Sequence, residues 1–166
     1  MLRIRLGIAA LAMLAVGAQL RAQAATQTVT FQVDAINAMS TSGAVTLHIT
    51  ASDVTAGASA TLSKTDATTT YAFTTNDNAA NGKTIQGALS SNMPAGLALK
   101  INVTAPGTGT SSGETSLTTS AAALVTGITP TNAATSAISY KLEAGVTAGP
   151  QASTSRTVNF TIIDTP

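Results

Sequence analysis

The sequence predicts an all-β protein: a single immunoglobulin-like or jelly-roll β-sandwich of about eight strands, with an extension strand at its N-terminus. Apolar residues make up 44% of the chain and alternate with Thr, Ser and other polar residues in short runs. Clusters of Gly, Pro, Asn and Ser separate these runs, and no run has the period of a long helix. Cysteine is absent, so disulfides do not stabilise this fold.

The individual strands follow from this alternation. The run at residues 26–36 places Val29, Phe31, Val33 and Ala35 on one face, and Thr and Gln on the other. Asn81-Gly82 is a turn dipeptide, and residues 120–128 are expected to hold a helical turn. The remaining strands are expected at residues 43–51, 68–76, 83–90, 97–105, 115–119, 136–146 and 154–164.

The N-terminus has the pattern of a secretion signal. Arg3 and Arg5 precede thirteen largely apolar residues, 6–18, and Ala22-Gln23-Ala24 is a small-x-small cleavage site. An apolar run of this length is too short for a permanent membrane span. The predicted organisation is a signal at 1–24, an N-terminal strand and linker at 25–42, and a sandwich domain at 43–166.

Charge limits the partners. Without the three arginines of the signal, five Lys and Arg remain against seven Asp and Glu, a net charge of −2. Such a chain has no basic surface for nucleic acid or anionic lipid. The sequence therefore predicts an exported bacterial protein, extracellular or at the cell surface, with neither a nucleic-acid partner nor a membrane span.

Motifs for chemistry are weak. Residues 109–113 match G-x-S-x-G around Ser111, but this motif needs a strand, a sharp turn and a helix, followed by an acid and a histidine. The single histidine, His48, precedes Ser111 and is expected on a solvent face. Residues 76–82 lack the alternating carboxylates of a calcium loop. We therefore expect no enzyme, no cofactor and no metal site.

The sequence bears on two kinds of covalent modification. Asn102 and Asn159 match the N-glycosylation pattern, so glycans are a candidate partner. A Lys–Asp or Lys–Asn crosslink would need a buried lysine beside a carboxylic acid. The lysines are instead expected to be solvated, at turns or on outward strand faces that protect strand edges; they are Lys64, Lys83, Lys100 and Lys141.

The first and last strands share one motif, Thr-Val-x-Phe-x-(Val/Ile), at residues 28–33 and 157–162. A free N-terminal strand with this pattern is suited to insertion into a neighbouring subunit. Backbone bonds would give affinity, and pockets for alternate side chains would give register. Head-to-tail repetition of such a contact does not close and produces a fibre. The sequence therefore predicts a homopolymer with Val29, Phe31, Val33 and Ala35 as the inserted face.

The chain resembles small secreted bacterial β-sandwich subunits of surface fibres, the group of donor-strand pilins and spore-coat-U-like pilus proteins. The resemblance is carried by the signal, the opening "TVTFQV", the Thr-, Ala- and Gly-rich body strands and the closing "TVNFTI". It implies a donor role for the N-terminal strand.

Two alternatives stay open. In the first, the N-terminal strand pairs within its own subunit. In the second, the protein is a monomeric adhesin or carbohydrate-binding module, although its aromatic residues are expected inside rather than on the surface.

Overall fold

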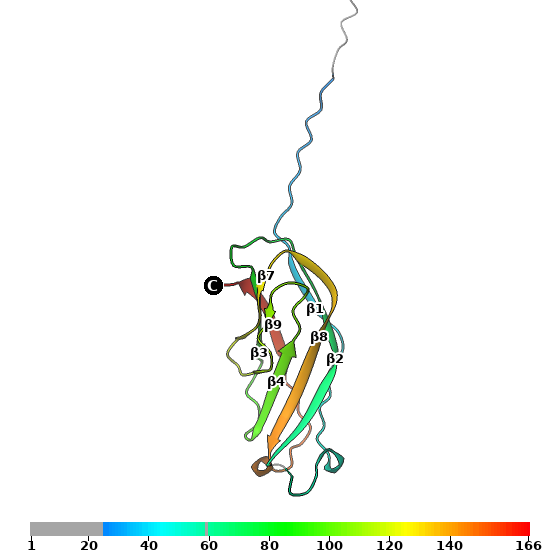
Figure 1. Cartoon of the computed structure of the whole chain (residues 1–166), viewed down its shortest axis with the longest axis vertical. Coiled ribbons are helices and arrows are strands. Elements are labelled where there is room, and N and C mark those ends of the chain that lie inside the picture. Colours follow the sequence, from blue (N-terminus) through cyan, green and yellow to red (C-terminus); the bar gives the residue numbers. More distant parts are fainter. Residues whose placement is uncertain (1–24, 59) are drawn as a thin grey trace, which may run out of the picture. The chain divides into compact units, whose positions relative to one another are not determined.

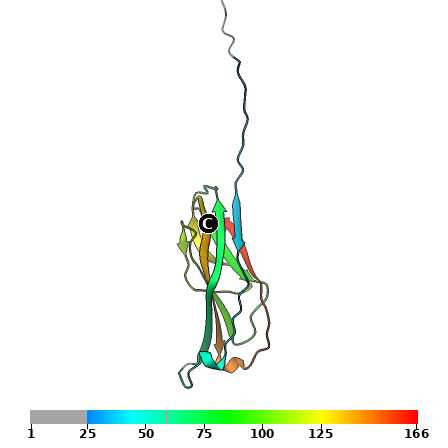
Figure 2. The ribbon, with the colours of Figure 1, turned by 90° about the vertical axis from the view of Figure 1, so that its right-hand side faces the viewer.

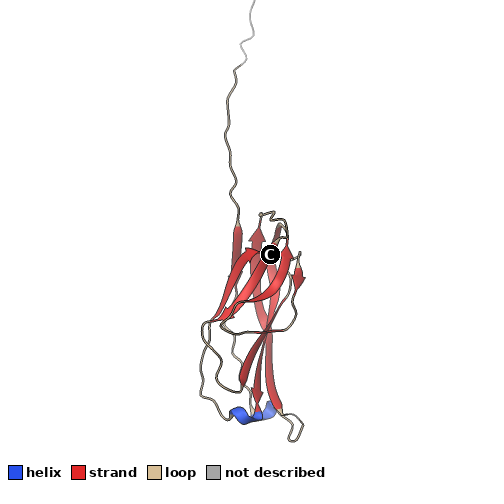
Figure 3. Ribbon diagram, turned by 90° about the vertical axis from the view of Figure 1, so that its left-hand side faces the viewer, coloured by secondary structure: helices blue, strands red, loops and turns tan. Residues whose placement is uncertain are grey.

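The computed structural model describes residues 25–58 and 60–166. Asp34–Pro166 form one compact unit, and the described residues before it, 25–33, belong to a separate unit. The predicted signal at 1–24 lies outside the described residues. The described chain holds nine strands and two short 3-10 turns, η1 and η2 (Figures 1 and 3): β1 Asn37–Thr41, η1 Ala51–Asp53, β2 Thr61–Thr75, β3 Lys83–Leu89, β4 Leu97–Val103, β5 Thr110–Ser111, β6 Thr115–Ser116, β7 Ala122–Ile128, β8 Thr131–Gly145, η2 Val146–Ala148 and β9 Val158–Asp164.

The strands form two antiparallel sheets, which confirms the predicted all-β sandwich. One sheet has the order β1-β2-β8-β4-β6, and the other has the order β5-β7-β3-β9. From β2 onward, every connection passes from one sheet to the other. Strands that follow each other in the chain therefore face each other across the core, and their hydrogen-bonded neighbours are distant in sequence.

The two lateral sides of the sandwich differ. Only three residues, 112–114, separate β5 from β6, so these two sheet ends lie on the same side. β1 and β9 are the opposite ends of the two sheets and therefore lie together on the other side, where Figure 2 draws them next to each other. We call this the β1/β9 side. A short crossing covers the β5/β6 side, whereas β1 and β9 are each the last described strand of their sheets.

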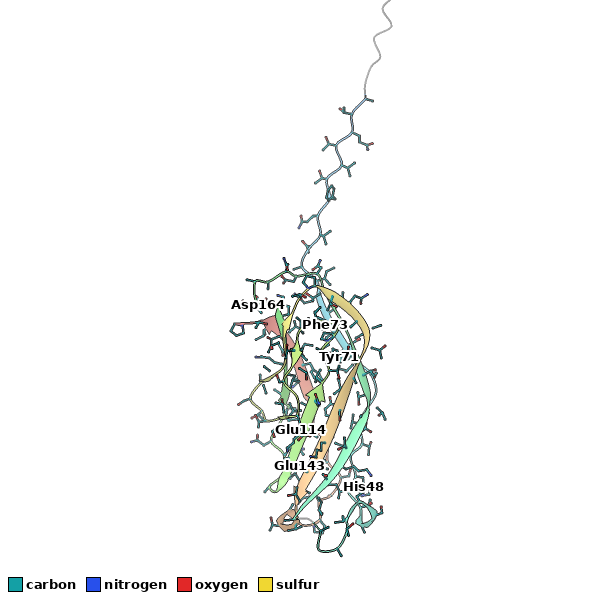
Figure 4. The ribbon with its side chains drawn as sticks, in the orientation of Figure 1. His48, Tyr71, Phe73, Glu114, Glu143 and Asp164 are labelled. Atoms are coloured by element: carbon teal, nitrogen blue, oxygen red, sulfur yellow. The ribbon has the colours of Figure 1, made fainter. Side chains whose placement is uncertain are left out.

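The core lies between the sheets and consists of the alternating residues that the sequence predicts. Tyr71 and Phe73 of β2 are 1% exposed, and Figure 4 shows both directed into the sandwich. The Tyr71 hydroxyl donates to the Thr104 carbonyl oxygen at 2.5 Å, which satisfies this buried polar group. The other fully enclosed apolar side chains include Ile85, Ile101, Val103, Leu124, Val125, Ile128 and Ile138.

The structure of a single copy differs from three sequence-based assignments of secondary structure. Residues 26–36 lie in neither sheet of their own copy, and β1 begins at Asn37, in residues expected to be a linker. Residues 43–50 also belong to neither sheet, although Val45 and Leu47 pack against the core. Alternation gives a segment two faces, but a strand also needs a ladder partner. The expected helical turn at 120–128 is strand β7, because Leu124 and Val125 fit the inter-sheet core.

Candidate assembly site

The N-terminal segment, residues 25–33, presents its apolar side chains to solvent. Val29 is 71% exposed, Phe31 is 88% exposed and Val33 is 77% exposed. Ala35, the fourth predicted site residue, is also exposed. A soluble protein rarely exposes a regular row of large apolar residues without a partner for it. This row is the first component of the candidate site.

Residues 34–37, the root of the segment, are held by the chain that follows β2. The Asn76 side chain accepts from the Ile36 N–H at 2.6 Å and donates to the Asp34 carbonyl oxygen at 3.0 Å. The Asn76 N–H donates to the Ile36 carbonyl oxygen at 3.2 Å. These bonds continue the β1–β2 pairing beyond the start of β1, so residues 34–36 keep the direction of that strand. In the sequence, Asn76 is the last residue of the strand expected at 68–76, and the alternation of that strand does not predict these bonds.

A buried lysine lies next to the root. The Lys83 side chain is 8% exposed, and its Nζ is 2.5 Å from Asp77 Oδ2 and also contacts Asp164 Oδ1. Asp77 Oδ2 accepts from Asn37 Nδ2 at 3.4 Å. Lys83 thus connects the chain after β2 in one sheet with β3 and the end of β9 in the other. The expectation of a solvated lysine was wrong here, because β3 directs this residue between two carboxylates.

The Lys83 cluster is ionic. Asp164 and then Asp77 raise the pKa of Lys83 above its usual value through hydrogen bonds to the ammonium group. Lys83 and then Asn37 lower the pKa of Asp77. Amide formation would require a neutral amine and a protonated acid, and the Asp164 side chain is 71% exposed to water. The environment therefore favours an ion pair over a Lys–Asp crosslink.

β9 supplies the second component of the candidate site, an open strand edge. The strand pairs with β3 from Leu89↔Val158 to Lys83↔Asp164. Ser90 donates its N–H to the Thr157 carbonyl oxygen, and Thr165 donates its N–H to the Gly82 carbonyl oxygen. In an antiparallel ladder, alternate residues direct their backbone groups to the same neighbour. The odd-numbered residues of β9 thus face β3, and the even-numbered residues direct their N–H and C=O groups to the open edge.

The same even-numbered residues carry the apolar side chains of β9. Val158, Phe160 and Ile162 pack against the core but remain half-buried. Met39 of β1 and Leu47 are also half-buried against this core. The β1/β9 side therefore combines available backbone groups with incompletely covered apolar side chains. The alternation of residues 154–164 predicts a strand but not an open edge, and the motif shared with residues 28–33 is the one signal of this property in the sequence.

Hollows next to β1 are small. One of ≈ 180 Å³ is lined by residues 40–42 and 70–72 with Ala134, and another of ≈ 170 Å³ is lined by residues 38–40 and 72–74. Ligand pockets usually have volumes of about 300–1,000 Å³. Neither hollow has the size of an ordinary small-molecule site.

The motifs weighed for catalysis are not brought together into a site. Ser111 lies in the two-residue strand β5, where its hydroxyl donates to Asn102 Oδ1 at 3.3 Å and accepts from the Gly113 N–H. His48 is exposed and lies in the segment that precedes η1. Within the described ranges, no group of three or more His, Cys, Asp or Glu residues could hold a metal ion. The candidate glycosylation residues Asn102 and Asn159 are both exposed.

The remaining lysines are paired. Lys100 and Lys141 are directly opposite on β4 and β8, where like charges repel. Glu143 binds both, at 3.0 and 2.8 Å, and Glu114 adds a longer contact to each; Figure 4 shows the two glutamates near one another. The pairing lies in the middle of the sheet. The expectation that these lysines protect a strand edge was therefore wrong.

Comparisons with protein-family models, curated proteins and solved structures give no match. In the part of the chain that the structure describes, no helix is long and apolar enough to cross a membrane.

Proposed function

We propose that this protein is the structural subunit of an extracellular, pilus-like bacterial fibre. In each contact, the N-terminal segment of one copy adds a strand to the β1/β9 side of the next copy. The observation that carries the proposal is the exposure of Val29, Phe31 and Val33 on a segment that belongs to neither sheet. The protein would be exported by its signal, and its partners would be copies of itself.

The β1/β9 side provides matching chemistry. An added strand could bond to the outward backbone groups of Val158, Phe160 and Ile162 and place its own alternate side chains over theirs. Burial of three large apolar side chains contributes about 1.5–3 kcal/mol each, and the new ladder satisfies the open edge. Together, these terms offset much of the cost of ordering the segment and joining two subunits.

A second copy is also a better partner than a small ligand. The aromatic residues of the body, which a sugar platform would expose, are buried at Tyr71, Phe73 and Tyr140 and half-buried at Phe160. The alternative of a monomeric adhesin or carbohydrate-binding module is therefore not favoured by any observation on the body.

The proposal can be tested with two triple variants that change opposite faces of the N-terminal segment. Val29→Ser, Phe31→Ser and Val33→Ser remove the apolar row, whereas Thr28→Ser, Thr30→Ser and Gln32→Ser change the alternate positions and keep it. Electron microscopy and size-exclusion chromatography should show fibres for the natural protein and the second variant, and only monomers for the first. If the first variant assembled as well as the second, the apolar row would not be the assembly element.

A further inference from the structure

The proposed function requires the segment of one copy to bind another copy rather than its own β9. The hydrogen bonds at the root, residues 34–37, distinguish between these two cases. Asn76 holds the backbone of Asp34 and Ile36 in line with β1 through three hydrogen bonds. Because Ile36 lies opposite Asn76, beyond the last residue of β2, the backbone of residues 34–36 extends past the end of that ladder.

The open edge of the same molecule lies in the opposite direction. Lys83 contacts both Asp77 and Asp164, so β9 ends next to the root. From Asp164, β9 extends back along the sheet to Val158, antiparallel to β3. A segment that leaves the root in line with β1 must therefore reverse its direction before it can lie along its own β9.

The sequence opposes this reversal. Residues 26–36 contain neither Gly nor Pro, the residues that tight turns use most. Because Asp34 and Ile36 are bound by Asn76, the turn would have to occur at Val33 or earlier. The turn would then include Val33 or Phe31, which are two of the three large apolar residues available for insertion.

On this basis, and assuming the proposed function, we infer that the Asn76–root contact prevents self-insertion and makes the open edge of β9 a site for the N-terminal segment of a second copy. A second copy whose root lies near Val158 can place its segment along β9 without a turn. This arrangement is antiparallel to β9, and it leaves the root contact intact in both molecules.

A flexible insertion tests the inference. Gly-Ser-Gly-Gly-Ser-Gly placed between Val33 and Asp34 supplies the missing turn and spans up to about 20 Å. The variant should fill its own edge, remain monomeric and lose fibre formation, with a higher denaturation midpoint than a variant lacking 26–35. The matched control carries the same six residues between Ala25 and Thr26 and should assemble like the natural protein.

Cysteine pairs identify the partner directly, since the chain has no cysteine. Thr161 lies in the middle of β9, and its side chain is exposed. Thr30 and Thr161 replaced together by Cys should crosslink between copies in the natural protein. They should crosslink within one chain in the variant with the insertion before Asp34.

Three outcomes would separate the two claims. Fibres from the insertion variant, with crosslinks still between copies, would overturn the inference and leave the proposed function intact. A natural protein that is monomeric and crosslinks within one chain would overturn both. A natural protein that neither assembles nor crosslinks, and is no more stable than the variant lacking 26–35, would overturn the proposed function itself.

Discussion

Residues 28–33 and 157–162 share the motif Thr-Val-x-Phe-x-(Val/Ile) but have different structures. In the first, Phe31 is 88% exposed and belongs to no sheet. In the second, Phe160 is half-buried, and its strand pairs with β3 along its whole length. The local pattern is the same, so the difference comes from the neighbour: β3 is available to β9, and the first copy of the motif has no corresponding ladder. Alternation determines which side chains share a face, and a partner strand determines whether that face is buried.

The largest difference between the two motifs should appear in matched alanine variants. Phe160→Ala removes packing from the body and should lower the free energy of unfolding by about 2 kcal/mol, less than the loss for a fully buried Phe. Phe31→Ala should leave the unfolding of the dissociated monomer unchanged, because this side chain is exposed, but should weaken assembly. Chemical denaturation of dissociated protein measures the first effect, and sedimentation measures the second. Equal destabilisation of the monomer by both changes would show that the segment packs on its own body.

The body was largely predictable from sequence, because its information is local. Leu99, Ile101 and Val103 alternate on β4 and are buried as expected. Gly82, expected at a turn, and Gly96, directly before β4, have φ of 76° and 79°, a conformation that glycine adopts without strain. Such features depend on a few adjacent residues and on the two-residue period of a strand.

The candidate site was less predictable, because it depends on long-range neighbours. The open edge of β9 follows from the strand order, which alternation does not specify. The burial of Lys83 requires Asp77 and Asp164 to lie on either side of its ammonium group, although these two aspartates are far apart in the sequence. The sequence predicts Val29, Phe31 and Val33 as donor positions, and this role stays a prediction; it does not predict which strand would accept them.

The tyrosines allow a second comparison of the body with the N-terminal segment, because both tyrosines lie in the body. Burial raises the pKa of Tyr71 and of Tyr140 from 10.0 to about 12. The folded state favours the neutral phenol, because burial disfavours the charged phenolate. Its stability is therefore fully retained below pH 10 and is lost as the pH rises through about 12. Tyrosinate absorbance should therefore rise together with the loss of the β-sheet circular dichroism signal, above pH 10. Removal of residues 26–35 from the dissociated monomer should not change this titration, and free titration near pH 10 with an intact sheet would contradict the buried positions.

A smaller effect is expected at Lys83, with Lys64 as its matched control. Lys64 forms a 2.6 Å pair with Asp53, but its side chain is 42% exposed, whereas the Lys83 side chain is 8% exposed between two carboxylates. Lys83→Met should therefore lower the thermal midpoint more than Lys64→Met, because it leaves Asp77 and Asp164 without their shared cation.

The stabilisation of the fold by the Lys83 ion pairs should also be lost at both acidic and alkaline pH. The lowered pKa of Asp77 means that its stabilisation is present above pH 3.8 and is lost as the pH falls through the folded-state pKa. The raised pKa of Lys83 means that its stabilisation is present below pH 10.5 and is lost at higher pH. The difference in thermal midpoint between Lys83→Met and the natural protein should thus be constant near neutral pH and shrink in acid. A difference that persisted at pH 2 would assign the effect to lost packing of the lysine side chain rather than to its charge.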